Sequence, residues 1–146
     1  MPCHGKKKKK GKKKKKPERE LLDESLLVPV LQIGDEIPDF TTDSNVGIIN
    51  FHEVIDGTFS VLVTFLHDFD PVATTELGML AKLKDEFLSR ECSVFALSVD
   101  IKSNHRKWIE DIHENQDCQI WFPMIADHNA EISRLLQLVK PKVSTK

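Results

Sequence analysis

From residue 31 onward, the apolar residues alternate between runs typical of strands and spacings typical of helices. Residues 59–66 form an apolar, β-branched run that is typical of a buried central strand, and residues 92–99 predict a second strand. Between them, Asp70 is a candidate N-cap for a helix that begins at Pro71 and reaches about Arg90. A strand, a helix and a strand in this order predict a right-handed parallel crossover.

Shorter elements complete the pattern. Residues 48–51 predict a β-rich entry, Ser103 is the expected cap of another helix, residues 121–126 predict a short strand, and a last helix stops at Pro141. The apolar residues of these two helices lie on one side of each: Trp108, Ile109 and Ile112 in the first, and Ile132, Leu135, Leu136 and Val139 in the last. Strands that alternate with helices place the chain in the α/β class.

The charges of the chain are divided between two segments. The chain has 146 residues, 40% of them apolar, which is enough for one domain with a modest core. Ten of the 21 basic residues are lysines within residues 6–16, which leaves 11 basic against 23 acidic residues from Pro17 onward, a net charge of −12. A basic tail therefore precedes an acidic body.

We expect residues 1–16 to be a disordered polylysine tail, residues 17–30 a linker, and residues 31–146 one domain. The tail contains no aromatic residue and no arginine, so any nucleic-acid binding is expected to be independent of base sequence. An anionic membrane surface, a nuclear import receptor and the absence of any dedicated partner are alternatives that the sequence leaves open. The candidate contacts are Lys6, Lys7, Lys8, Lys9, Lys10, Lys12, Lys13, Lys14, Lys15 and Lys16.

The sequence shows no pattern typical of a disulfide framework, a zinc site or a membrane-spanning helix. Cys3, Cys92 and Cys118 have unrelated spacings, which suggests neither a disulfide framework nor a zinc site. No apolar stretch approaches the ~20 residues that span a bilayer, so no transmembrane segment is expected. We therefore expect a cytoplasmic or nuclear location, without a cofactor or a metal.

The corner that follows the first long strand carries a family resemblance. Residues 68–76 match seven of the nine positions of the loop Asp-Phe-Thr-Pro-Val-Cys-Thr-Thr-Glu, so this segment resembles the active-site loop of the one-cysteine peroxiredoxins of the AhpC/TSA type. Similar stretches extend over about residues 31–139, including His105, Trp108 and the run Phe122-Pro123-Met124-Ile125. The resemblance implies a thioredoxin-like fold and thiol-dependent peroxide reduction, an antioxidant activity.

The same loop departs from the family where the chemistry takes place. Ala73 occupies the position of the peroxidatic cysteine, Asp70 that of a threonine that positions peroxide, and Leu66 that of a proline. The family's activating arginine has no counterpart, and neither do the strands and the helix that follow in the family. These departures predict an inactive, shortened domain that acts by binding, if at all. The strand at residues 59–66 is expected to have a free edge and either to pair with a peroxiredoxin-like chain, of the same or another kind, or to aggregate.

Other residues offer alternative chemistry. Cys118 or Cys3 could support a weak thiol peroxidase, whereas Cys92 is about 25 Å from the loop by helix length. A phospholipase activity known in the subgroup is disfavoured, because His52 matches its histidine but Thr58 takes the place of its serine. A metal site at His67, Asp68 and Asp70 is also disfavoured, since loop residues of this kind more often cap a helix.

Overall fold

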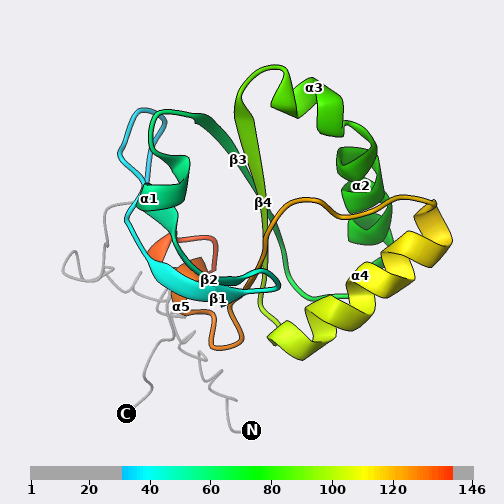
Figure 1. Cartoon of the computed structure of the whole chain (residues 1–146). Helices are drawn as coiled ribbons and strands as arrows, with labels where there is room; N and C mark the ends of the chain where they lie inside the picture. Colours follow the sequence, from blue (N-terminus) through cyan, green and yellow to red (C-terminus); the bar gives the residue numbers. More distant parts are fainter. Residues whose placement is uncertain (1–30, 140–146) are drawn as a thin grey trace, which may run out of the picture. The chain divides into compact units, whose positions relative to one another are not determined.

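In a computed structural model, residues 31–139 are described, and they form a five-stranded sheet with helices on both faces (Figure 1). The predicted α/β class is confirmed. The predicted tail, the predicted linker and Pro141 lie outside the described residues. Within the described part of the chain, no helix has the length and apolar character needed to cross a bilayer.

The sheet has the order β2-β1-β5-β4-β3. Its strands are β1 (Thr41–Ser44), β2 (Gly47–Asn50), β3 (Phe59–Phe65), β4 (Cys92–Ser98) and β5 (Met124–Ala126). β1 and β2 form an antiparallel hairpin, whereas β3, β4 and β5 run parallel. The register of β3 and β4 pairs Phe59 with Cys92 and Phe65 with Ser98, so the predicted parallel crossover is confirmed.

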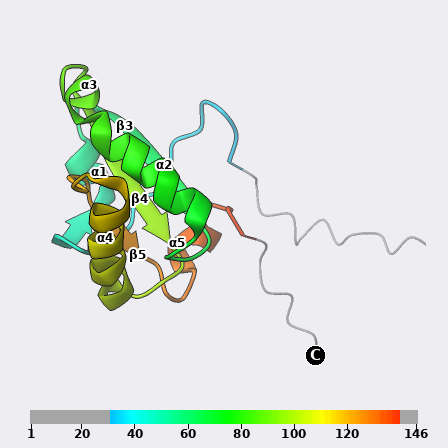
Figure 2. The same ribbon diagram turned by 90° about the vertical axis from the view of Figure 1, so that its right-hand side faces the viewer.

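Helices cover the sheet from both sides, as Figures 1 and 2 show. They are α1 (Phe51–Ile55), α2 (Pro71–Lys82), α3 (Lys84–Leu88), α4 (Lys102–Gln116) and α5 (Glu131–Leu135). Side chains alternate along β4: Val94 and Ala96 pack in one cluster with α2 and α4, and Phe95 and Leu97 pack in another with α1 and α5. Because β4 is covered on both faces, it forms the centre of the core.

The predicted central strand, residues 59–66, is an edge strand in the structure. Among the described residues β3 pairs with β4 alone, and Phe59 is 79% exposed. An apolar run does not specify how many neighbours a strand has, so this prediction was wrong about position although right about the strand. The edge agrees with the free edge that the family resemblance implies.

The predicted helix from Pro71 to about Arg90 is interrupted. It begins as expected, but it ends at Lys82, where Leu83 has φ −90° and ψ 18° and donates its N–H to Leu80 O. α3 follows as a separate turn, with Phe87 packed against the core and Leu83 exposed. Apolar spacing alone therefore overestimated the length of this helix.

The ends of three other elements differ from prediction. α4 begins at Lys102 rather than after Ser103, and Asp100 Oδ1 accepts hydrogen bonds from Ile101 N and Asn104 Nδ2 at its start. The predicted strand at 121–126 is limited to β5, and the predicted entry strand at 48–51 is β2, with Phe51 beginning α1.

The last helix is shorter than its apolar spacing predicts. Gln137 adopts a left-handed conformation with φ 58°, Leu138 N donates to Ser133 O at 2.8 Å, and Gln137 N donates to Arg134 O at 3.0 Å. These two bonds are the Schellman arrangement that ends a helix. Val139 therefore lies beyond α5.

Candidate active site

Asp70 caps the first turn of α2 at the carboxyl end of β3. Its Oδ2 accepts a hydrogen bond from Ala73 N at 2.8 Å, and its carbonyl oxygen accepts bonds from the N–H and the hydroxyl of Thr74, both at 2.8 Å. Pro71 occupies the first helical position, where a missing N–H costs nothing. The predicted cap is thus confirmed, and a carboxylate already lies at the positive end of this helix.

Ala73 lies in the core rather than in an open site. Its side chain is 3% exposed and packs in the cluster that also contains Leu77, Trp108 and Met124. The methyl group has no atom that can act as a nucleophile, and the Ala73 N–H is occupied by Asp70. The exposed Leu66, at the end of β3, likewise offers no polar atom in its side chain.

Trp108 contacts the loop from the side of the core. Its Nε1–H donates to Thr74 Oγ1 at 2.9 Å, and the ring of Phe65 packs edge-on against it with centroids 5.1 Å apart. Phe69, with a left-handed φ of 60°, places its ring 6.2 Å from the same indole. A left-handed conformation is costly for a bulky residue, so contacts such as these must maintain it.

A buried polar network lies beneath the loop. Asp68 accepts a hydrogen bond from Ser98 Oγ at 2.6 Å with Oδ1, and one from His105 Nδ1 at 2.6 Å with Oδ2. His105 Nε2 lies 3.1 Å from Ile125 O, so both ring nitrogens face acceptors. Because a neutral imidazole can donate from only one nitrogen, His105 satisfies both bonds as an imidazolium ion.

The pKa of His105 agrees with this assignment. Burial by itself lowers the pKa, but the hydrogen bond and the negative charge of Asp68 outweigh it, with smaller contributions from Ile125 O and Asp100, and the pKa is raised. Both side chains of the pair are 0% exposed. This pair was not predicted as a unit, because no local signal connects residues 37 positions apart.

The three loop residues considered as metal ligands do not converge. Asp68 points inward to His105, Asp70 caps α2, and His67 Nδ1 lies 3.0 Å from Asp68 O. Within residues 31–139, no cluster of three or more His, Cys, Asp or Glu residues could hold a metal ion. Each of these three side chains thus makes a hydrogen bond of its own within the chain.

Neither of the two cysteines in residues 31–139 belongs to the loop. Cys92 begins β4 opposite Phe59, whereas the loop follows the other end of β3, about 20 Å along a strand of this length. Cys118 follows the end of α4 and is partly buried against the core, and burial raises the pKa of its thiol, which reduces the thiolate fraction. Cys3 lies outside the described residues.

His52 and Thr58 each make local hydrogen bonds. His52 Nε2 lies 2.7 Å from Ile37 O, and the Thr58 hydroxyl donates to Ile55 O at 3.1 Å. The histidine is therefore held beside the start of α1, as a packed residue of that corner. No hydrogen bond joins these two side chains in the described part of the chain.

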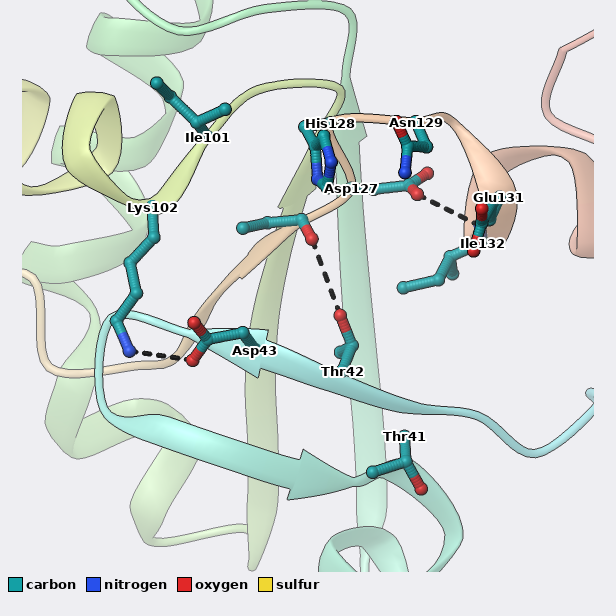
Figure 3. A pocket seen from close by; sticks show the side chains of 11 residues that line it. Thr41, Thr42, Asp43, Ile101, Lys102, Asp127, His128, Asn129, Glu131 and Ile132 are labelled. Carbon is teal, nitrogen blue, oxygen red and sulfur yellow. Dashed lines mark hydrogen bonds and ion pairs between the residues drawn. The ribbon is translucent and has the colours of Figure 1, made fainter.

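A cavity of about 360 Å³ lies elsewhere, between β1, the start of α4 and the segment that joins β5 to α5 (Figure 3). Lys102 Nζ and Asp43 Oδ1 form an ion pair of 2.7 Å on its wall, and the hydrogen bond from Lys102 lowers the pKa of Asp43. Asp127 accepts bonds from Ile132 N and Ser133 N, and so caps α5. None of the loop residues 66–76 lines this cavity.

Comparison with known proteins agrees with the loop resemblance. Residues 33–146 match the model of the AhpC/TSA family. The chain is 44% identical over 111 residues to a 1-Cys peroxiredoxin of Dictyostelium discoideum, covering 76% of this chain and 46% of the relative. It is 38% identical over 115 residues to human peroxiredoxin-6, covering 76% of this chain and 51% of that relative. The chain thus spans about half the length of these curated relatives.

Solved structures of the same group share the fold. The yeast mitochondrial 1-Cys peroxiredoxin superposes with a TM-score of 0.74 at 38% identity, covering 75% of this chain and 52% of that one. A cysteine-to-serine mutant of the peroxiredoxin 6 of Arenicola marina superposes with a TM-score of 0.71 at 33% identity, covering 79% and 53%. The thioredoxin-like fold expected from the resemblance is confirmed.

Proposed function

Because the chain belongs to the AhpC/TSA family, we propose that it is a one-cysteine peroxiredoxin-like domain that has lost peroxidase chemistry at the family's loop and acts by binding. The observation that carries this proposal is Ala73, buried at the position that the cysteine has in the family resemblance. In peroxide reduction, a thiolate attacks one oxygen of the O–O bond and becomes a sulfenic acid that keeps this oxygen, while the O–O bond breaks and the other oxygen takes up a proton and leaves as water or an alcohol. A methyl group donates no electron pair.

Asp70 supports the same conclusion independently. Its carboxylate accepts the Ala73 N–H at 2.8 Å, so a negative charge lies beside this position. A carboxylate this close to a thiol disfavours the thiolate, which raises the thiol pKa. Nucleophile and electrostatic environment have therefore both changed.

The test is peroxide consumption by the full chain with dithiothreitol as the reductant. We expect the rate to equal that of the reductant alone. Ala73→Cys supplies the sulfur, and Ala73→Cys combined with Asp70→Thr also removes the carboxylate, so the double variant is expected to ionise its thiol at lower pH than the single one. Protein-dependent turnover by the native chain would contradict the proposal.

The competing enzyme hypothesis is a weak thiol peroxidase that uses Cys118 or Cys3. Its test is the replacement of each cysteine by serine, with Cys92→Ser as the control for a thiol remote from the loop. Turnover that falls in the Cys118→Ser or the Cys3→Ser variant would support the hypothesis. The raised pKa of Cys118 argues against that thiol.

The lysine tail supports a second, electrostatic role. Ten lysines within 11 residues are expected to contact polyanions without base specificity, in a cytoplasmic or nuclear location. Deletion of residues 1–16 tests this role by polyanion binding at low salt, with a steep loss of affinity at higher salt expected for the full chain. Equal binding with and without the tail would remove this alternative.

Association with peroxiredoxin-like chains, of the same or another kind, is the binding role that the fold favours. β3 has a free edge within residues 31–139 and an apolar side-chain row along it. Exposed strand edges pair with other strands unless charge, proline or a covering element prevents it.

A further inference from the structure

The cavity beside β1 lies where the topology of the sheet favours a ligand site. β4 and β5 are parallel neighbours, but the helices that follow them cover opposite faces, because α4 packs in the cluster of Val94 and α5 in the cluster of Phe95. In open α/β sheets, such a reversal leaves a crevice beyond the carboxyl ends of the strands, where ligands commonly bind. The cavity of about 360 Å³ lies between these diverging segments, since its walls include the start of α4 and the segment that follows β5.

The cavity has the size and the lining of a small-molecule site. Ligand pockets usually have volumes of about 300–1,000 Å³ and combine apolar walls with a few polar groups. Here Ile101 and Ile132 supply apolar surface, and Thr41 and Thr42 supply hydroxyl groups. Every lining residue lies between residues 41 and 132, well inside the described range of 31–139. The walls are thus formed by elements that the structure describes completely.

Two of the three carboxylates that line the cavity are already compensated. Asp127 is buried and accepts hydrogen bonds from two backbone N–H groups and one hydroxyl of α5, at 2.7 to 3.1 Å. Asp43 pairs with Lys102 at 2.7 Å. Glu131 differs, because no hydrogen bond or ion pair engages its side chain within residues 31–139. One carboxylate of the cavity is therefore free to bind a positive group.

The opposite side of the cavity carries spare hydrogen-bond donors. Lys102 donates one hydrogen bond, to Asp43 Oδ1, whereas an ammonium group has three N–H donors. The hydrogen bond from Lys102 lowers the pKa of Asp43 and the charge of Arg106 lowers it further, so two cations act on one carboxylate there. Figure 3 shows Lys102 and Asp43 on one side of the cavity and Glu131 on the other. A positive and a negative group thus line the same cavity from opposite sides.

This arrangement favours a ligand with charges of both signs. An anion alone would bind at Lys102 but would also meet the negative charge of Glu131, and a cation alone would leave the donors of Lys102 unused. A molecule with an ammonium group at one end and a carboxylate at the other matches both sides, and the complementary charges fix its orientation. A short peptide has this form, and the side chains of Thr42 and Asn129 offer polar groups to its backbone.

We propose that this cavity binds a short zwitterionic peptide, with the ammonium group of the peptide at Glu131 and its carboxylate at Lys102. None of the loop residues 66–76 takes part, so the site is separate from the position where the family resemblance implies a cysteine. The proposed peptide site therefore goes beyond the proposed loss of peroxide chemistry and does not depend on it.

The first test is the titration of the full chain with trialanine, measured by calorimetry and by amide NMR shifts. Trialanine with free ends is expected to bind and to shift the amide signals of residues 101–102 and 126–132. N-acetyl-trialanine lacks the ammonium group and trialanine amide lacks the carboxylate. We expect each to bind roughly tenfold more weakly, because the loss of one hydrogen bond to a charged group changes affinity by about this factor.

Two variants assign the ends of the peptide. Glu131→Gln should weaken the binding of trialanine roughly tenfold without weakening that of N-acetyl-trialanine, which has no ammonium group to lose. Lys102→Gln should weaken trialanine by a similar factor without weakening trialanine amide, which has no carboxylate. The matched controls are Glu114→Gln and Lys107→Gln, which change exposed residues of α4 outside the cavity and should bind as the native chain does.

Four outcomes would overturn the proposal: no binding of trialanine to the full chain, equal binding of the three peptides, NMR shifts at the loop instead of the cavity, or control variants that lose as much affinity as Glu131→Gln and Lys102→Gln. Thermal unfolding of each variant checks that the fold survives, and the blocked peptides test the same contacts on the native chain. Peroxide consumption is measured separately, so failure of the peptide site is distinguishable from failure of the proposed loss of chemistry.

Discussion

At the scale of single residues, His105 and Asp68 form a fully buried ion pair within residues 31–139. His105 carries a positive charge where no water reaches, and Asp68, Ser98 and Ile125 O satisfy the hydrogen bonds of the pair. A buried ion pair often adds little net stability, but removal of one partner leaves an uncompensated charge. The pair also joins the loop after β3 to α4 and β5, so it positions three segments at once.

Replacement of His105 should therefore be costly. His105→Gln leaves Asp68 buried without its counter-ion, and we expect the free energy of unfolding to fall by about 3–5 kcal/mol. Urea unfolding measures this loss. His128→Gln, at an exposed histidine, is the matched control and should change stability little. A small effect of His105→Gln would show that the pair is not ionic.

The same pair makes stability depend on pH. The folded pKa of His105 is raised above its unfolded value of about 6.5, so the contribution of the pair is fully present below about pH 6.5. It is lost as the pH rises through the folded pKa, because the unfolded chain releases its proton first. Urea unfolding of the native chain above neutral pH should show this decline, and His105→Gln should lack it. Parallel pH profiles of the two proteins would contradict the assignment.

At the scale of elements, the start of α2 depends on Asp70. Its side chain satisfies the Ala73 N–H, and a capping residue contributes typically about 0.5–2 kcal/mol. Asp70→Ala should lower the free energy of unfolding by this amount, whereas Asp70→Ser, which retains a capping oxygen, should lower it less. Thermal or urea unfolding of both variants checks the difference. Equal losses would mean that the cap contributes nothing.

Element boundaries differed from prediction where tertiary contacts compete with spacing. The leucine pattern continues through Leu83, yet α2 ends there and Phe87 packs beside Trp121 with ring centroids 6.3 Å apart. The last helix ends before Gln137, which adopts a left-handed conformation. Because glycine is the usual residue at such a helix end, a glutamine there gave no sequence signal for the end of the helix. The start of α2 was predictable because Asp70 and Pro71 act within one turn.

At the scale of the whole molecule, the sheet has a strongly protected centre and an unprotected edge. Residues 94–98 of β4 are buried and lie between the two clusters, while β3 has strand neighbours on one side only within residues 31–139. Stability is therefore expected to be highest at β4 and to fall toward the outer strands.

Amide hydrogen exchange should reveal this gradient. β4 is expected to exchange slowest, and the β1–β2 hairpin faster. β3, which has a strand neighbour on one side only within residues 31–139, is expected to exchange faster than β4. Equal protection of β3 and β4 would contradict the gradient.

The sequence by itself determined what depends on neighbours within one turn or on residue identity alone. It located the two long strands, the Asp70 cap and the Pro71 helix start, and it identified Ala73 as the position where the family resemblance implies a cysteine, since each is readable within a few positions. Only the tertiary structure decided that β3 lies at an edge, that Asp68 faces His105, and that His67, Asp68 and Asp70 point to different partners. These features depend on which distant segments the chain brings together, and no local pattern of polar and apolar residues specifies that.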